Sequence, residues 1–317
     1  MKRGLIIVAV VLAAAGASAD WVYEGRWGSG GSGNGEFKAP YGISAAPRGR
    51  VYVADTGNNR VQYFTPTGSF VGKWGAEGSG GLDRPSGIGV SRNGYVYVAD
   101  TYHDRVGCFT AAGSLLGMWG SRGYGDGEFR RPWGVLAVGD DVYVVDNLNH
   151  RVQYFTALGS FRGKWGSMGS GDGEFTNPHN VAVAANGNIY VVDTVNNRVQ
   201  YFTANGSFLG KWGGGGSRDG EFYFPGGVGI DSRGYVYVAD TYNHRVQYFT
   251  PTGSFLGKWG TRGTGNGQFM YPWDIAVAPG GDRIYVVSMF LCRVQYFKWV
   301  NVDLEPVSLG RVKAVFK

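Results

Sequence analysis

The sequence predicts an all-β protein, built from six copies of one four-stranded antiparallel unit that together close into a ring. The first observation behind this prediction is an internal period of about 46 residues, which recurs six times. The second is the alternation of apolar and polar residues in short segments such as 50–55, which is typical of β-strands. The third is composition: 56 of the 317 residues are Gly, 43% are hydrophobic and 15% are aromatic. This apolar content excludes a disordered chain, and the many glycines indicate short strands joined by tight turns.

Three markers establish the period independently. The Pro that begins the first strand of each unit stands at Pro40, Pro85, Pro132, Pro178, Pro225 and Pro272. The Arg that follows the central turn stands at Arg60, Arg105, Arg151, Arg198, Arg245 and Arg293. The Trp-Gly pair begins at Trp27, Trp74, Trp119, Trp165, Trp212 and Trp259. Because the three series stay in phase, the repeat is the organising unit of the fold.

One unit contains four strands in sequence. In the first copy they are expected at 40–43, 50–55, 60–64 and 69–75, with turns at 56–59 and 66–68 that are rich in Gly, Asn and Pro. Four antiparallel strands in about 46 residues form one blade of a β-propeller. No segment has the periodicity of an amphipathic helix. The predicted fold is therefore a six-bladed β-propeller of four-stranded antiparallel blades.

Residue size varies across the unit as a ring requires. The first strands of all blades meet near the axis, where there is little room, and Gly42, Gly87, Gly134 and Gly227 lie there. Outer strands fill a wider circumference and need larger residues, which are Phe64, Phe109, Phe155, Phe202, Phe249 and Phe297. We expect Gly134→Leu to cause a clash that costs about 1–3 kcal/mol or more.

The two ends of the chain are expected to close the ring. The sixth unit stops at Phe297 without its Gly-Lys-Trp-Gly strand, whereas residues 22–28 resemble the fourth strand at 255–260. The N-terminal strand should therefore complete the last blade. Closure of this kind hides two open sheet edges, which would otherwise promote aggregation.

Residues 1–19 have the layout of a secretory signal peptide. Two basic residues, Lys2 and Arg3, precede an apolar run at 5–15, and small residues at 17–19 offer a cleavage site. We therefore divide the chain into a signal peptide (1–19), a propeller (20–299) and a C-terminal tail (300–317). The expected location is extracytoplasmic, either periplasmic or secreted, and no transmembrane span is expected after cleavage. The tail is apolar and basic, and its role is left open.

Net charge limits the classes of partner, and cysteine content limits the covalent cross-links. The formal net charge is +6, and cleavage after residue 19 lowers it to 28 − 24 = +4. This small excess argues against nucleic acid as the partner. Cys108 and Cys292 do not form a disulfide framework, and both are expected to be free.

The repeat resembles the NHL repeat. The resemblance rests on Pro-Tyr-Gly-Ile at 40–43, on Val-Tyr-Val-Ala-Asp-Thr-Gly-Asn-Asn-Arg-Val-Gln-Tyr-Phe at 51–64, and on the Gly-rich linkers that end in Glu-Phe. It covers about residues 21–299. It implies a six-bladed β-propeller that serves as a binding platform; tripartite-motif relatives bind RNA or protein on one face, and a bacterial kinase carries such a propeller as an extracytoplasmic sensor.

Two repeated features are expected to be structural. A carboxylate lies five residues before the Arg in five units, at Asp55, Asp100, Asp146, Asp193 and Asp240. It should cap the turn backbone and pair with that Arg. The sixth unit instead has Ser-Met-Phe-Leu-Cys at 288–292, which removes the carboxylate and adds exposed apolar groups, and we interpret it as a weaker turn or a local contact patch. The Gly-rich loops at 30–36 and 169–174 lack the Lys-Ser/Thr of a phosphate loop and the spacing of a calcium loop, so they are interpreted as blade connectors.

The channel mouth is the predicted binding site, because its positions are the least repetitive of the unit. The candidate ligand-binding residues are Tyr41, Trp133, His179, Asn180, Trp273 and Asp274. Aromatic walls with a few polar groups suit a carbohydrate, a peptide or another organic ligand. The alternative is that these rings merely plug the axis.

Three function classes remain, with different requirements. The preferred one is an exported, non-catalytic binding or scaffold module for a protein or glycan partner, with no cofactor, no metal and no catalytic residue. The second is a metal-dependent lyase or lactonase. The zinc-dependent peptidyl-hydroxyglycine lyases have similar repeats and use a Pro-His step, but here only His179 follows the Pro, and gluconolactonase-like ligands are limited to Asn180 and Asp274. The third is an RNA-binding NHL platform, which rests on family analogy alone.

Overall fold

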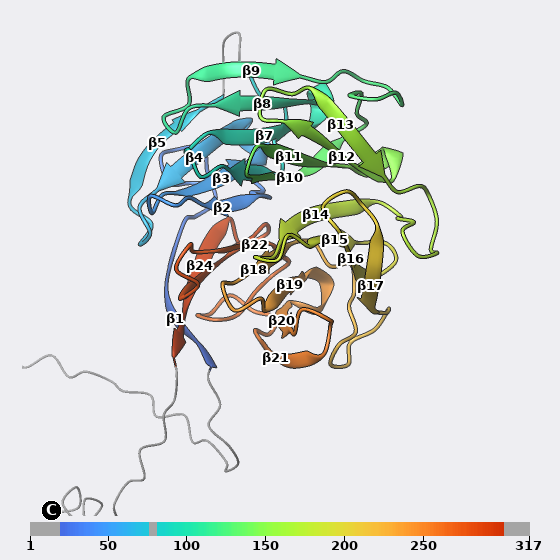
Figure 1. Cartoon of the computed structure of the whole chain (residues 1–317). Coiled ribbons are helices and arrows are strands. Elements are labelled where there is room, and N and C mark those ends of the chain that lie inside the picture. Colours follow the sequence, from blue (N-terminus) through green and yellow to red (C-terminus); the bar gives the residue numbers. More distant parts are fainter. Residues whose placement is uncertain (1–19, 76–80, 301–317) are drawn as a thin grey trace, which may run out of the picture.

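The computed structural model describes residues 20–75 and 81–300, and these residues form a six-bladed β-propeller of four-stranded antiparallel sheets (Figure 1). Five blades follow chain order. They are β2 (Ile43–Ala45), β3 (Val51–Asp55), β4 (Arg60–Phe64) and β5 (Phe70–Trp74); β6 (Ile88–Val90), β7 (Val96–Asp100), β8 (Arg105–Phe109) and β9 (Leu115–Trp119); β10 (Pro132–Val138), β11 (Asp141–Asp146), β12 (Arg151–Thr156) and β13 (Phe161–Trp165); β14 (Pro178–Val183), β15 (Ile189–Asp193), β16 (Arg198–Phe202) and β17 (Phe208–Gly213); and β18 (Val228–Ile230), β19 (Val236–Asp240), β20 (Arg245–Phe249) and β21 (Phe255–Trp259).

The sixth blade joins the two ends of the chain, as the sequence predicts. It consists of β22 (Pro272–Val277), β23 (Arg283–Ser288), β24 (Arg293–Val300) and, on its outer edge, β1 (Asp20–Trp27). The register runs from Asp20 opposite Val300 to Trp27 opposite Val294, with a bulge between Tyr23 and Gly25. Figure 1 shows β1 lying against β24. The predicted signal peptide and the tail from residue 301 lie outside the described residues.

The only helical segments in the described part of the chain are four single turns of 3-10 helix that follow the second strand of a blade. They are η1 (Thr56–Asn58), η2 (Thr101–His103), η3 (Asn147–Asn149) and η4 (Thr241–Asn243). The residue after each turn has a left-handed backbone, with φ near +55° at Asn59 and His150. This conformation explains the Asn, Asp and His at that position, because these residues tolerate positive φ better than most. None of these helices is long and apolar enough to cross a membrane.

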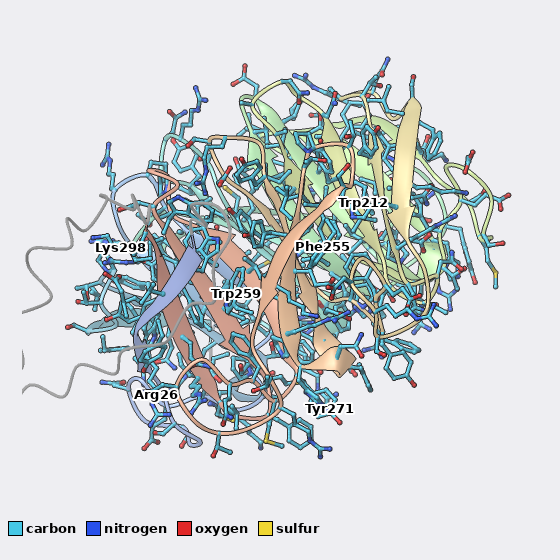
Figure 2. The ribbon with its side chains drawn as sticks, turned by 90° about the horizontal axis from the view of Figure 1, so that it is seen from below. Arg26, Trp212, Phe255, Trp259, Tyr271 and Lys298 are labelled. Atoms are coloured by element: carbon cyan, nitrogen blue, oxygen red, sulfur yellow. The ribbon has the colours of Figure 1, made fainter. Side chains whose placement is uncertain are left out.

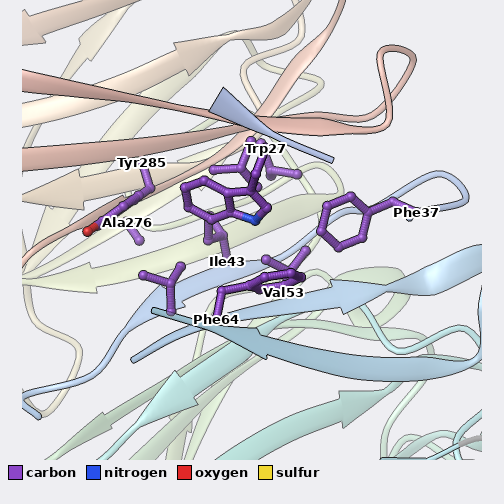
Figure 3. Packing of buried hydrophobic residues seen from close by; sticks show 10 residues of the cluster. Trp27, Phe37, Ile43, Val53, Phe64, Ala276 and Tyr285 are labelled. Carbon is purple, nitrogen blue, oxygen red and sulfur yellow. The ribbon is translucent and has the colours of Figure 1, made fainter. Parts of the chain in front are cut away.

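The hydrophobic core consists of one cluster between each pair of neighbouring blades. The predicted wedge residues, from Phe64 to Phe297, are buried on the third strand of each blade. At the closure, Trp27 of β1 packs against Phe64 of the first blade and Tyr285 of the sixth, with ring centroids 5.7 and 5.8 Å apart (Figure 3). Apolar packing of the kind that holds neighbouring blades together elsewhere therefore also holds the first blade to the sixth, where the two ends of the chain meet.

The repeated Asp residues hold the blades to their connectors. Asp55 is fully buried and accepts from Arg60 Nε at 2.6 Å, as predicted, and from the main-chain N–H of Lys38 at 2.7 Å. Lys38 lies in the connector and not in the turn after Asp55, so the prediction that Asp55 caps its own turn is wrong. Arg60 extends the network by donating to the carbonyls of Ser32, Gly33 and Glu36. One buried ion pair thus fixes the path of the Gly-rich connector.

The Gly-rich connectors bind a carboxylate of their own. Glu36 Oε2 accepts from the main-chain N–H of Gly33 at 2.8 Å, and Glu174 does the same with Gly171. A Cβ at Gly31 or Gly169 would collide with that carboxylate. The loops are therefore connectors, as predicted, and their resemblance to an anion-binding loop reflects a group that the protein supplies itself.

Candidate functional site

Four aromatic rings fill the channel mouth at the residue that follows the Pro in four blades. Tyr41 contacts Trp273 edge-on with centroids 4.9 Å apart, and Trp133 stacks on His179 at 4.3 Å and 13°. Trp133 and Trp273 also contact each other. The other two blades have Ser86 and Gly226 at this position, and the hollow among all six measures about 20 Å³, room for about one water molecule. The structure brings the predicted rings together, but they pack on one another and leave no pocket.

Asn180 and Asp274 form a polar bridge directly below the rings. Asn180 Nδ2 donates to Asp274 Oδ1 at 2.5 Å, across the space that Gly226 and Gly227 of the fifth blade leave free. Asp274 also accepts from the main-chain N–H groups of Ile43 at 3.0 Å and Ile275 at 2.8 Å. The bridge separates the mouth from a second cavity of about 210 Å³, which is lined by the innermost strands. The axis is therefore not an open channel.

Burial shifts the pKa of two of these groups in opposite directions. Burial raises the pKa of Asp274 to about 7, although three hydrogen bonds favour the charged form. Burial lowers the pKa of His179 to about 3, and its Nδ1 has no hydrogen-bond partner among the described residues. His179 is therefore a neutral ring in the plug. In the described residues no three His, Cys, Asp or Glu side chains gather as metal ligands would.

These two groups give stability opposite dependences on pH. The folded pKa of Asp274 lies above the unfolded value of about 4, so its contribution is present below pH 4 and is lost as the pH rises through 7. The folded pKa of His179 lies below the unfolded value of about 6.5, so its contribution is present above pH 6.5 and is lost as the pH falls. The two slopes offset each other between about pH 4 and 6.5.

Asp274→Asn is expected to remove the opposing contribution of Asp274, so that the pH dependence of stability due to His179 becomes measurable. Between pH 6.5 and 4 the variant should lose free energy of unfolding about 1.4 kcal/mol per pH unit more steeply than the parent. Urea unfolding at a series of pH values measures this difference. His179→Gln is the reverse control, because its stability should rise on acidification. Parallel curves for the parent and Asp274→Asn would contradict the assignment.

An exposed apolar ring surrounds the plug, and sequence reasoning found only its member in the last turn, within 288–292. Its members lie two residues after the strand-ending Asp or Ser, in the turn of each blade except the first. They are Tyr102, Leu148, Val195, Tyr242 and Phe290. The signal was available in the sequence, since an apolar residue in a solvent-exposed turn is unusual at five equivalent positions. Because successive turns of an antiparallel blade alternate between its two ends, these turns share one end with the connectors, which we call the mouth face.

On the fifth and sixth blades this ring widens into an aromatic arc, made of Tyr223, Phe224, Tyr242, Tyr271 and Phe290. Neighbouring rings touch: Tyr242 lies 5.5 Å from Tyr223 and 5.1 Å from Tyr271, and Tyr271 lies 5.1 Å from Phe290. Figure 2 shows Tyr271 at the same end of the blades as Arg26. Tyr242 is 44% exposed and Phe290 is 63% exposed, so the arc is a continuous surface and not part of the core.

Arginine and tyrosine form a second cluster on the mouth face, over the second and third blades. The Arg131 guanidinium lies 3.4 Å from the ring centre of Tyr102, and that of Arg84 lies 4.5 Å from it. Arg84 also donates to the Tyr102 hydroxyl at 2.8 Å. The hydrogen bond and charge of Arg131 lower the pKa of Tyr102. This Arg–Tyr cluster presents positive charge and an aromatic ring together.

Backbone conformation holds both clusters in place. The residue before each Pro has a left-handed φ between +44° and +56°, including Arg84, Arg131, Phe224 and Tyr271. Non-Gly residues in this region cost about 1–3 kcal/mol each, and such strain concentrates at functional sites. Hydrogen bonds to the preceding blade stabilise this left-handed conformation. The N–H of Phe224 donates to Asn197 Oδ1 at 2.7 Å, and the N–H of Tyr271 donates to His244 Nδ1.

Of the three histidines in the turns, His150 and His244 make contacts between blades, whereas His103 contacts a residue of its own blade. His150 Nδ1 accepts from the N–H of Asn177 at 3.0 Å, as His244 does from Tyr271. Burial lowers the pKa of both rings, which keeps Nδ1 available as an acceptor. His103 contacts Asp100 Oδ2 at 2.9 Å. Both cysteines are free: Cys108 is buried on β8, and Cys292 lies in the last turn.

The architecture and the repeat define the class of protein. Residues 129–213 match the family described as a 6-bladed beta-propeller, and residues 37–64, 82–109 and 222–249 match the NHL repeat. The chain contains NHL repeats and folds as a six-bladed β-propeller.

Curated relatives match over about one repeat. Protein lin-41 of Caenorhabditis elegans is 53% identical over 47 residues, which is 15% of this chain and 4% of that protein. The E3 ubiquitin-protein ligase TRIM71 of Rattus norvegicus is 48% identical over 44 residues, which is 14% of this chain and 5% of that protein. The similarity therefore concerns the repeat, since the match spans only a small part of either relative.

Solved structures share the fold at low identity. A Bacteroides thetaiotaomicron protein of unknown function is 16% identical with a TM-score of 0.67, covering 89% of this chain and 77% of the other. A gluconolactonase from Xanthomonas campestris is 13% identical with a TM-score of 0.63, covering 84% and 88%. A streptogramin B lyase is 12% identical with a TM-score of 0.61, covering 83% and 94%. At these identities the likeness concerns the fold alone.

Proposed function

We propose that this chain is a non-catalytic binding module that recognises a protein or glycan partner through its mouth face, outside the cytoplasm. The observation that carries the proposal is the aromatic arc, in which five rings touch in sequence and Tyr223, Tyr242 and Phe290 are exposed to solvent. Large exposed apolar patches on soluble proteins mark interaction sites. The neighbouring Arg–Tyr cluster adds Arg and Tyr, the residue types that dominate binding energy at interfaces.

The filled axis supports a binding role over an enzymatic one. The hollow at the mouth measures about 20 Å³, whereas pockets for organic ligands usually measure about 300–1,000 Å³. His179 is neutral, stacked on Trp133 and without a second histidine ligand beside it. The six predicted mouth residues then act as a rigid floor, and the partner contacts the rim around them.

The extracytoplasmic location follows from the predicted signal peptide at 1–19, which lies outside the described residues. A partner should therefore be sought in the medium or envelope fraction of the native cell. The preference for protein over nucleic acid rests on the net charge of +4 after cleavage and on the aromatic character of the rim.

A pair of variants on opposite faces tests the proposal. We expect Tyr242→Ser with Phe290→Ser to weaken partner binding by tenfold or more, since exposed aromatic anchors each contribute about 2 kcal/mol or more. Leu158→Ser is the control, because Leu158 is 92% exposed in a turn between third and fourth strands, at the other end of the blades. The measurement is quantitative capture of envelope proteins and glycans by immobilised mature protein. Equal capture by the double variant and the parent would exclude the aromatic arc as the binding surface.

Trp133 and Trp273 give a second arm of the same experiment. If a small ligand displaces the plug, Trp133→Ala with Trp273→Ala should abolish thermal shifts that a ligand panel produces with the parent. If the partner binds only the rim, these shifts are absent in both proteins while capture persists. The two arms therefore separate a ligand in the axis from a partner on the face.

A further inference from the structure

The sixth blade contains a buried arginine that has lost its carboxylate. Ser288 stands where the other blades have Asp, and it is paired in register with Arg293 as Asp55 is with Arg60. Ser288 is 0% exposed and Arg293 is 7% exposed. Ser288 Oγ and Arg293 Nε have no hydrogen-bond partner among the described residues. In the other five blades the equivalent Nε donates to the Asp carboxylate at 2.6–2.8 Å.

The arginine nevertheless keeps the pose that it has in the other blades. Its terminal nitrogens donate to the connector carbonyls of Thr264 at 2.8 Å, Gly265 at 2.9 Å and Gln268 at 3.2 Å. These bonds match those of Arg60 to Ser32, Gly33 and Glu36. The guanidinium therefore does not move to fill the place of the missing carboxylate.

Other donors that surround the carboxylate elsewhere are also retained. Gln295 Nε2 donates to the Gln268 carbonyl at 2.7 Å, but its second bond, which Gln62 makes to Asp55 at 3.1 Å, has no acceptor here. The main-chain N–H of Met270 stands at the connector position of Lys38, whose N–H bonds Asp55. Two side-chain donors, Arg293 Nε and Gln295 Nε2, are thus placed as they are around a carboxylate. Ser288 Oγ is a third donor, at the position of the lost Asp, and the N–H of Met270 is a fourth by its equivalence in sequence to Lys38.

The charge balance also favours an anion. Burial lowers the pKa of Arg293, and the nearby cation Arg26 lowers it further. Glu24, on the same strand as Arg26, is paired with Arg283 at 2.7 Å. A buried charge without a counter-charge is strongly unfavourable, and arginine does not deprotonate in proteins.

We propose that the sixth blade binds a small monovalent anion, of chloride or formate size, between Ser288 and Arg293. The anion takes the place of the Asp carboxylate of the other blades and accepts from the four donors named above. It fastens the last turn, 289–292, to its connector, and so stabilises the blade that closes the ring. This site is independent of the proposed binding function of the mouth face.

Thermal unfolding in different sodium salts at constant ionic strength tests the proposal. The melting temperature of the parent should rise with the logarithm of chloride or formate concentration, by about 3 °C or more over gluconate, which is too large for the site. Ser288→Asp supplies the carboxylate internally, so it should melt higher in gluconate and lose the response to chloride. Asp55→Ser should create a second site in the first blade and become more dependent on chloride than the parent.

A direct measurement accompanies the melting curves. Crystals of the protein grown in bromide should show an anomalous peak within about 3.5 Å of Arg293 Nε, and crystals of Ser288→Asp should not. Equal responses of the parent and Ser288→Asp to chloride, or a water molecule in place of the bromide peak, would overturn the proposal.

Discussion

Asp146→Ala is expected to lower the free energy of unfolding by about 3–5 kcal/mol, because it leaves a buried guanidinium without its counter-charge. Asp146 is fully buried and accepts from Arg151 Nε at 2.8 Å, from the N–H of Arg130 at 2.8 Å and from Asn149 Nδ2 at 2.9 Å. Arg151 is fixed by connector carbonyls and cannot turn towards solvent.

The third blade offers a matched control. Asp126 pairs with Lys164 at 2.5 Å, but both side chains are about half exposed, so Asp126→Ala should cost about 1 kcal/mol or less. The measurement is the urea midpoint of each variant, with circular dichroism to show that the fold persists. Similar losses of free energy of unfolding in the two variants would mean that the buried Asp–Arg pair contributes no more to stability than the exposed Asp–Lys pair.

Gly134→Ala is the second large effect that we expect, with a loss of about 1–3 kcal/mol and a greater loss for Gly134→Leu. A Cβ at position 134 would lie 2.8 Å from the main-chain oxygen of His179 and 2.9 Å from the Cα of Asn180. Both contacts are with the innermost strand of the next blade, which is held by its own ladder and cannot yield locally.

Gly117→Ala on β9 is the control, because a Cβ there meets no atom within 4 Å and the backbone has no positive φ. It should leave stability unchanged or raise it by about 0.4–1 kcal/mol through the unfolded state. Thermal and urea unfolding of the three variants measure the contrast. If Gly134→Ala and Gly117→Ala have the same melting temperature, the axis is less crowded than its geometry indicates.

Much of this fold could be predicted from the sequence because the fold is a repetition. The Pro, Arg and Trp series fixed the number of blades, and the missing fourth strand of the last unit identified β1 as its replacement. Strand boundaries shifted by a few residues: β2 begins at Ile43, after the crowded glycine at 42, whereas β10 begins at Pro132. These differences in strand boundaries depend on how the blades pack at the axis, which cannot be read from the sequence of one repeat.

The site could be predicted only in part. The six mouth residues were found because they break the repetition, and the structure places them together. Their mutual packing was not predictable, because Asn180 and Asp274 meet across a blade whose own residues are Gly226 and Gly227. Of the aromatic arc, only the apolar segment 288–292 was recognised as a contact patch. The other members look like ordinary turn residues until the fold brings Tyr242, Tyr271 and Phe290 side by side.

The pairing of β1 with β24 also decides which way the propeller faces when it is anchored. Trp27 and Val294 lie beside the last turn on the mouth face, so Asp20 and Val300 leave the blade together at the opposite end (Figure 1). A tether attached before residue 20 or after residue 300 therefore emerges from the back of the disc. Immobilisation through residue 20 or residue 300 would leave the aromatic rim facing the solution.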